Sequence, residues 1–298
     1  MSDTVPGKTS IEDIILNNDC RGISALRPFL PSSFCEDAAR FILEKSGPQR
    51  KTALITTGFF ILSAEAPETD GPPGTIALAG ALRQLGFEVV YVSDRYGTPL
   101  LTVDGTGTEQ VIEFPISDHA ASRDFARGLL ADIKPDILIA IERCGFTADN
   151  RHLNMAGRDI SDFTAKIDYL FPGQANTLGI GDGGNEIGMG RFTRQIKSSA
   201  DLTGDPAVTP THKTIISTVS NWGAYGLITA LSRLSRRDLL PSVEWTGELL
   251  TELVARGAVD GISGRTECTV DAFSAEQNAG VLLQLKQLLQ NDTISAAA

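Results

Sequence analysis

Long apolar segments and targeting signals are missing from this chain of 298 residues. No apolar run approaches the roughly 20 residues that a helix needs to cross a bilayer, so we expect no membrane partner. The first residues, MSDTVPGKTSIEDIILNN, show neither a basic segment followed by an apolar one nor an Arg-rich, acid-poor composition. These absences predict a cytoplasmic protein.

Clustered positive charge is also missing. The chain has 26 Lys and Arg residues, which are scattered, against 37 Asp and Glu residues, and its net charge is −11. Because phosphate binding needs clusters of basic side chains, we expect no nucleic-acid partner. The composition is that of an ordinary globular protein and leaves a homo-oligomer open.

Several kinds of catalytic motif are absent as well. The four cysteines lie far apart and form no CxxC pair, which argues against a zinc site or a disulfide framework. No G-x-S-x-G elbow is present, and no two histidines stand at metal-ligand spacing. Cys144 stands in an acidic setting, whereas a thiolate nucleophile needs a cationic one. Nucleophilic catalysis is therefore disfavoured.

What the chain does contain is an alternation of short, apolar, β-branched segments with helical ones. Strands separated by helices at this spacing form right-handed βαβ units and a parallel sheet. We therefore expect an α/β fold, Rossmann-like, with a mostly parallel sheet and flanking helices. The predicted strands lie at 51–61, 87–94, 135–143 and 212–220. The predicted helices lie at 75–86, 122–134, 221–236, 246–257 and 274–290.

Three parts of the chain are expected along its length. Residues 1–47 form a helical N-terminal segment, residues 48–290 form the α/β domain, and residues 291–298 form a frayed tail. At the start of the helix that follows the last predicted strand, Ser220 or Asn221 is expected as the N-cap.

Acidic residues follow several of the predicted strands, where open parallel sheets bind their ligands. We interpret Glu65, Glu68 and Asp94 as solvated loop acids, with Asp94 also suited to a turn or cap. Asp70 fits a turn and a functional site equally well. Glu142 ends a strongly apolar strand, where a carboxylate is costly without a partner, so we expect it to be functional.

A glycine-rich stretch, GIGDGGNEIGMG at residues 179–190, raises the question of which ion it holds. Three of its glycines fit the dinucleotide pattern G-x-G-x-x-G, yet Asp182 and Glu186 would face a pyrophosphate with like charge. Glycines also allow the backbone to bend so that Asp182, Asn185 and Glu186 converge, and hard divalent cations prefer such oxygen ligands. The pattern favours a cation, with a turn carrying solvated acids as the structural alternative.

Several motifs together resemble the C-terminal domain of the D-glutamate cyclase family. They are ETDGPPG (68–74), IER (141–143), NMAGRDIS (154–161), the glycine-rich stretch and VDGISGRTECTVD (259–271). The resemblance extends from about residue 50 to about residue 275. Two positions depart from the family pattern, since IERPG and NMRG are expected where this chain has Cys144 and Ala156. With only a helical segment before the domain, the chain is similar to the stand-alone microbial form.

The resemblance implies a hydro-lyase that converts D-glutamate, or a similar amino acid, to 5-oxo-D-proline and water. It also implies a divalent metal, Mn²⁺ first and Mg²⁺ or Ca²⁺ as alternatives. The expected metal ligands are Asp70, Glu142, Asp182 and Glu186, and the expected catalytic residues are Glu142, Asp182 and Glu186. The expected substrate-binding residues are Arg143, Arg151, Asn154 and Asn221.

Other functions remain compatible with the same residues. A metal-dependent phosphohydrolase would use the acidic cluster to hold a metal against a phosphate. A non-catalytic protein that binds a small ligand or a metal would bind without turnover. If the glycine-rich stretch held NAD instead, NAD and not manganese would raise the thermal stability.

Overall fold

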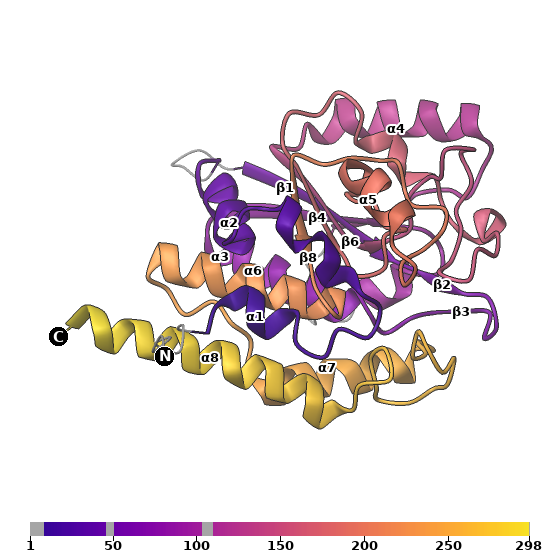
Figure 1. Ribbon diagram of the computed structural model, residues 1–298. Coiled ribbons are helices and arrows are strands. Elements are labelled where there is room, and N and C mark those ends of the chain that lie inside the picture. Colours follow the sequence, from indigo (N-terminus) through magenta and orange to yellow (C-terminus); the bar gives the residue numbers. More distant parts are fainter. Residues whose placement is uncertain (1–8, 46–50, 103–109, 298) are drawn as a thin grey trace.

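A parallel sheet of six strands forms the centre of the molecule (Figure 1). The computed structural model describes residues 9–45, 51–102 and 110–297 of the chain. In sheet order, the strands are β5 (Gln110–Glu113), β4 (Phe87–Ser93), β1 (Lys51–Gly58), β6 (Ile137–Arg143), β7 (Thr177–Gly181) and β8 (Lys213–Ile216). Doubly wound dinucleotide-binding sheets have the same order, with a ligand crevice where the winding reverses. Here the winding reverses between β1 and β6.

Both faces of the sheet are buried. Ile55, Tyr91 and Ile139 belong to the larger core on one face, whereas Leu54 and Leu138 belong to the smaller core on the opposite face. Successive side chains of a strand point to opposite faces, so a sheet covered on both sides needs nearly continuous apolar strands. This explains the uninterrupted apolar segments of the sequence.

Helices cover the two faces in unequal numbers (Figure 1). The face of the larger core carries α3 (Pro72–Gln84), α6 (Ser220–Ser235) and α2 (Phe34–Leu43), and the other face carries α4 (His119–Ile133). An outer layer against α6 and α3 consists of α1 (Ile11–Ile15), α7 (Val243–Ala255) and α8 (Ala275–Ala297). Among the described residues, no helix combines the length and apolar character needed to span a membrane.

Short elements connect these layers. They are α5 (Thr193–Ser198), the hairpin of β2 (Phe60–Ile61) and β3 (Ala66–Pro67), and the 3-10 helices η1 (Ile23–Phe29), η2 (Thr98–Leu101), η3 (Ser161–Phe163), η4 (Ile167–Leu170) and η5 (Gly190–Phe192).

The α/β architecture with a parallel sheet is confirmed, but two strands were not predicted. β7 has the sequence TLGIG, so the first residues of the glycine-rich stretch belong to a strand. β5 is four residues long and only partly buried. Both are too short for a periodic pattern to identify them.

The ends of the chain also differ in detail from the expectation. Ile14, Phe34 and Ile42 of the N-terminal segment are buried in the same core as the sheet. At the other end, α8 runs to Ala297 and so includes most of the segment that the sequence predicts to be a frayed tail.

The contact between α3 and α6 depends on a glycine, and this gives a first prediction. A Cβ atom at Gly74 would lie 2.8 Å from Cβ of Ala224 and 3.0 Å from Cα of Asn221, whereas a Cβ at Gly80 on the same helix would meet nothing within 4 Å. We expect Gly74→Ala to lower the free energy of unfolding by about 1–3 kcal/mol because it forces the helices apart. Gly80→Ala should leave it unchanged or raise it by up to ~1 kcal/mol. Urea denaturation measures both, and equal effects would contradict this packing.

Candidate active site

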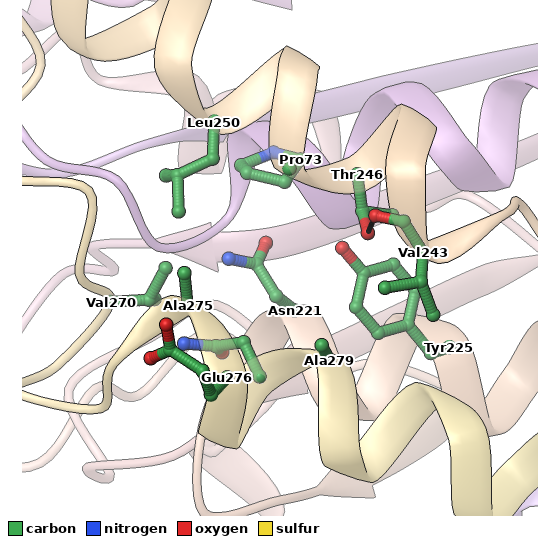
Figure 2. Close-up of a pocket in the computed structure, with 12 residues that line it drawn as sticks. Pro73, Asn221, Tyr225, Val243, Thr246, Leu250, Val270, Ala275, Glu276 and Ala279 are labelled. Atoms are coloured by element: carbon green, nitrogen blue, oxygen red, sulfur yellow. Dashed lines mark hydrogen bonds between the residues drawn. The ribbon is translucent and has the colours of Figure 1, made fainter.

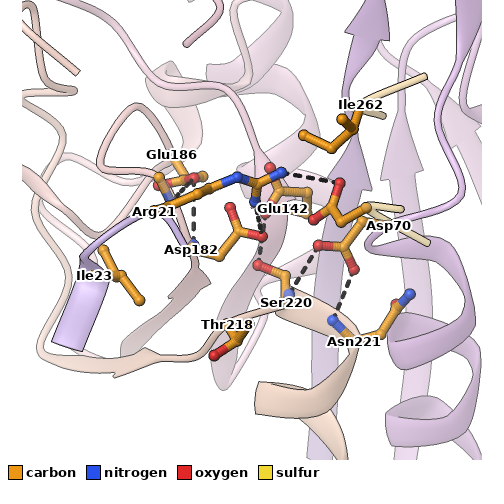
Figure 3. A network of polar contacts seen from close by, with 12 residues as sticks. Arg21, Ile23, Asp70, Glu142, Asp182, Glu186, Thr218, Ser220, Asn221 and Ile262 are labelled. Atoms are coloured by element: carbon orange, nitrogen blue, oxygen red, sulfur yellow. Dashed lines mark hydrogen bonds and ion pairs between the residues drawn. The ribbon is translucent and has the colours of Figure 1, made fainter. Parts of the chain in front are cut away.

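Six buried carboxylates gather at the carboxyl ends of β1, β6 and β7, beside the N-terminus of α6. Figure 3 shows four of them with Arg21 lying across them. The six are Glu68, Asp70, Glu142, Asp182, Glu186 and Asp271, and each is at most 6% exposed. They lie at the carboxyl-end edge of the sheet, where the winding reverses and a ligand is expected.

Glu142 reaches the cluster because β6 is irregular at its end. The register slips between Thr57 and Gly58 of β1, so Ile141 and Arg143 are paired while Glu142 is left unpaired as a bulge. Glu142 has a φ of 44°, a left-handed conformation that is unfavourable for a residue with a side chain. Bulges re-aim side chains, and here the carboxylate turns into the crevice, where it accepts a 2.6 Å hydrogen bond from the hydroxyl of Ser220.

Asp70 binds the N-terminus of α6. Its two carboxylate oxygens accept hydrogen bonds of 2.8 Å from the backbone N–H groups of Ser220 and Asn221. The prediction that Ser220 or Asn221 caps this helix is therefore wrong: Val219 is the N-cap residue, its side chain makes no capping bond, and the carboxylate comes from a distant segment. A carboxylate at this position is favoured by the helix dipole and by the free N–H groups.

The backbone N–H groups of the glycine-rich loop after β7 bind a carboxylate from the same loop. Glu186 accepts hydrogen bonds from the N–H groups of Gly183 at 2.7 Å and Gly184 at 2.8 Å, so its carboxylate lies in the concavity that a phosphate would fill in a dinucleotide site. Asp182 begins the loop and lies 2% exposed beside Glu186. The loop amides are thus satisfied by Glu186, and the carboxylates face the crevice.

Two further carboxylates, Glu68 and Asp271, were not among the expected site residues. Glu68 was expected to be a solvated loop acid, and that expectation is wrong, because a bridge between Glu68 and Val259 draws it into the crevice at 5% exposure. Asp271 lies on the same later loop, which Asp260 braces by accepting the N–H of Ala272 at 2.8 Å. Oε1 of Glu68 and Oδ2 of Asp271 are buried without a hydrogen-bond partner.

Arg21 is the one basic side chain that forms ion pairs with these carboxylates within the described part of the chain. Its guanidinium pairs with Asp182, and its Nη2 lies 3.0 Å from Oδ1 of Asp271. The Arg21 side chain is 17% exposed. Six carboxylates against one guanidinium leave an excess of negative charge that the described side chains do not balance, and burying unbalanced charge is costly.

The unbalanced charge appears as shifted pKa values. Burial, with Asp271 nearby, raises the pKa of Asp70 to about 7. Burial and neighbouring carboxylates also raise the pKa values of Glu68 and Glu142 well above their usual range. For Asp182, burial raises the pKa more than the Arg21 guanidinium lowers it. These carboxyl groups therefore favour a bound proton, or an added cation, over free negative charge.

Oxygen atoms of the cluster are close enough together to coordinate a metal ion. Asp70, Asp182 and Asp271 form one group, and Glu142, Asp182 and Glu186 form a second; within each group the candidate ligand atoms lie within 4.8 Å of one another. Asp182 belongs to both groups. All the donors are carboxylate oxygens, which suit hard divalent cations such as Mg²⁺, Ca²⁺ and Mn²⁺. The four expected metal ligands therefore lie together.

The four expected substrate-binding residues do not lie together. Asn221 adjoins the cluster, but its Oδ1 already accepts the N–H groups of Gly71 at 3.0 Å and Gly74 at 2.8 Å. Asn154 accepts backbone N–H groups within its own turn, and Arg151 is exposed and pairs with acids on the surface.

Arg143 points away from the acid cluster. It is 1% exposed, pairs with Asp94 at 2.6 Å and donates to the carbonyl oxygens of Gly58 and Ala165. Asp94 also accepts the N–H of Tyr96 at 3.1 Å, so it has the turn role that the sequence suggested, but it is buried and is not a solvated acid. The Arg143–Asp94 pair braces the ends of β4 and β6.

A separate cavity of about 230 Å³ lies between α6, α7 and the start of α8 (Figure 2). Its walls are mostly apolar, with Val243, Leu250 and Ala279 among them, and Asn221 forms the wall nearest the acid cluster. Tyr225 also lines it, and burial raises the pKa of its hydroxyl. The cavity adjoins the carboxylate site without contributing metal ligands to it.

Comparison with known proteins is consistent with this geometry. A sequence profile of D-glutamate cyclase-like proteins, C-terminal region, matches residues 11–286. The chain belongs to this family. Human mitochondrial D-glutamate cyclase is 32% identical to this family member in an alignment 263 residues long that covers 79% of the chain and 40% of the human protein. The chain thus spans about two fifths of the length of that relative.

Two solved structures that match the chain do not add to the family assignment. A mandelate oxidase bound to benzoyl-formic acid matches 95% of this family member and 92% of its own chain, with 15% sequence identity and a TM-score of 0.22. A second mandelate oxidase, with 3,3-difluoro-2-hydroxy-3-phenylpropionic acid, gives a TM-score of 0.23 at 16% identity. Such scores carry no structural argument.

Removal of divalent cations should make the stability of the protein depend on pH near neutrality. The folded-state pKa of Asp70 is raised above its unfolded value, so its contribution to stability is complete below about pH 4 and is lost as pH rises through about 7. With a chelator present, we expect the free energy of unfolding to fall between pH 5 and 8, by on the order of a few kcal/mol. Excess Mn²⁺ should reduce this fall, since the cation replaces the protons.

Two variants control this measurement by urea denaturation. Asp70→Asn should reduce the pH dependence of the chelated protein, whereas Asp132→Asn, at an exposed position on α4, should leave it unchanged. The free energy of unfolding of the chelated wild-type protein could instead stay constant or rise from pH 5 to 8. That result would show that repulsion between the buried carboxylates does not destabilise the fold.

Proposed function

We propose that this family member is a hydro-lyase that cyclises D-glutamate to 5-oxo-D-proline and water with the help of a divalent cation. Family membership supports the reaction class. The observation that carries the proposal is the cluster of six buried carboxylates with one guanidinium among them. Such a site suits a cation and a substrate that carries an ammonium group.

The residues present fit a hard divalent cation, with Mn²⁺ first and Mg²⁺ or Ca²⁺ as alternatives. Glu142, Asp182 and Glu186 would hold it, because their oxygens lie within 4.8 Å of one another. When bound, the cation supplies neutralisation of the substrate γ-carboxylate and stabilisation of the oxyanion that develops on it. Asp70 stays at the N-terminus of α6, where its hydrogen bonds fix that edge of the site.

The reaction also needs a group that moves protons. The α-nitrogen forms a bond to the γ-carbon, a carbon–oxygen bond breaks, and two protons pass from the ammonium group to the oxygen that leaves as water. Glu142 suits this role, because the hydroxyl of Ser220 donates to one of its oxygens, and a carboxylate that holds a cation through one oxygen can exchange a proton at the other. We assign to Glu142 the transfer of these two protons, one after the other, from the ammonium group to the leaving oxygen.

The substrate contacts of this proposal are fewer than the sequence suggested. Asn221, at the edge of the cluster, stays a proposed contact. The loop that carries Arg151 and Asn154 also stays one, because Nδ2 of Asn185 donates to the carbonyl of Leu153 in that loop at 3.0 Å. Both terminal nitrogens of Arg143 are engaged by Asp94 and by carbonyl groups, so we give it a structural role.

The direct test is incubation with D-glutamate and Mn²⁺, followed by chiral chromatography for 5-oxo-D-proline. We expect product from D-glutamate, loss of product with a chelator, and recovery with added Mn²⁺. L-glutamate and a phosphate ester such as p-nitrophenyl phosphate serve as comparison substrates. Turnover of the phosphate ester alone would favour a phosphohydrolase, and Mn²⁺ binding without any turnover would favour a binding protein.

Two variants test proton transfer and metal binding separately. Glu142→Gln keeps an oxygen toward the cation but cannot take up a proton, so kcat should fall about 10²–10⁴-fold while Mn²⁺ binding persists. Asp182→Asn should weaken Mn²⁺ binding itself, measured by calorimetry. Glu113→Gln, at the exposed end of β5 outside the cluster, is the matched control and should change neither. An unimpaired Glu142→Gln would contradict the proton-transfer role.

A further inference from the structure

Arg21 pairs with acids that could otherwise hold a second metal ion. The two groups of acids overlap at Asp182, and two-metal sites place their ions about 3.5–4 Å apart with shared ligands. The guanidinium pairs with Asp182 and Asp271, which are two of the three members of the group Asp70, Asp182 and Asp271. Among the described residues, Arg21 forms no ion pair with Glu142 or Glu186, which make up the other group together with Asp182.

A second observation shows that the surroundings of Asp271 are built to hold positive charge. Oε1 of Glu68 and Oδ2 of Asp271 are buried without a hydrogen-bond partner, in residues that are 5% and 6% exposed. A Cβ atom at Gly261 would lie 2.4 Å from Oε2 of Glu68 and 2.8 Å from Oδ1 of Asp271, so both carboxylates flank this glycine. Buried carboxylate oxygens without donors are the expected environment of a cation.

The turn that presents Arg21 is itself strongly constrained. The carboxylate of Asp19 accepts the backbone N–H groups of Arg21, Gly22, Ile23 and Ser24 at 2.8–3.3 Å. Gly22 has a φ of 79°, which only glycine adopts easily.

Thr218 attaches the segment before this turn to the site. Its N–H donates to the carbonyl of Ile15 at 2.9 Å, and its hydroxyl donates to the carbonyl of Asn17 at 3.0 Å. In Figure 3, Ile23 and Thr218 both lie below the Arg21 side chain. The guanidinium is therefore held in the cluster by the N-terminal segment, and it is not a loose surface side chain.

We propose that Arg21 is a built-in cation that fills the group Asp70–Asp182–Asp271, so that the chain binds one divalent cation, at Glu142–Asp182–Glu186, and not two. This inference rests on the metal site of the proposed function. A guanidinium stays charged at any working pH and binds two carboxylates through separate N–H groups, so it can replace an ion permanently. In this arrangement Asp182 binds both the guanidinium and the single metal ion.

The test counts metal ions per chain in variants of Arg21. Calorimetric titration with Mn²⁺ should give one ion per wild-type chain and two per chain in Arg21→Met and in Arg21→Gln, neither of which carries a charge. Electron paramagnetic resonance should show an isolated Mn²⁺ in the wild type and a spin-coupled pair in the two variants. Arg21→Lys keeps the charge and should bind one ion.

Two further variants make the count specific. Arg27→Met removes a neighbouring arginine that pairs with Asp13 on the surface, and it should bind one ion like the wild type. Asp271→Asn added to Arg21→Met should return the count from two to one. Circular dichroism of each chelated variant checks that it is folded before titration, and Arg21→Gln gives the same test if Arg21→Met does not fold.

The outcomes separate this inference from the proposal on which it rests. Two ions in the wild type, or one ion in both folded uncharged variants of Arg21, would overturn the role of Arg21 while leaving the metal site intact. No Mn²⁺ bound by the wild type would overturn the metal site itself.

Discussion

Mutual repulsion between buried carboxylates is the constraint on which the rest of this structure depends. Six acids share one crevice, and their local contacts are arranged to hold them there: Asp70 by the first N–H groups of α6, Glu186 by the amides of its own loop, and Asp182 by Arg21. None of these contacts neutralises the whole cluster. The remaining charge calls for protons or for a metal ion, and a cyclisation that moves protons and polarises a carboxylate can use both.

The parallel sheet makes this arrangement possible, because it delivers distant segments to one edge. The bulge at the end of β6 turns Glu142 into the crevice while Arg143 braces β4 on the opposite side. The glycine-rich loop is a variation on a phosphate cradle: its amides bind an anion, but the anion is the Glu186 side chain of the same loop. The local geometry of an anion cradle thus holds a carboxylate of the chain itself.

The sequence predicts the α/β class, the parallel sheet and four of the six clustered acids, because each of these depends on a local pattern. Apolar periodicity identified β1, β4, β6 and α6, and glycines beside carboxylates identified Asp182 and Glu186. Glu68 and Asp271 were missed because their burial follows from a long-range bridge to the loop at residue 259. Arg21 was missed because nothing in the motif DCRG indicates that the N-terminal segment reaches the carboxyl ends of the strands.

The central claim is that the crevice between β6, β7 and α6 is a divalent-cation site. A crystal grown with Mn²⁺ and measured at the manganese absorption edge tests it most directly. The account predicts an anomalous peak about 2.0–2.6 Å from carboxylate oxygens of Glu142, Asp182 and Glu186. An ordered crevice without a peak, or a peak only at surface acids elsewhere, would contradict the account.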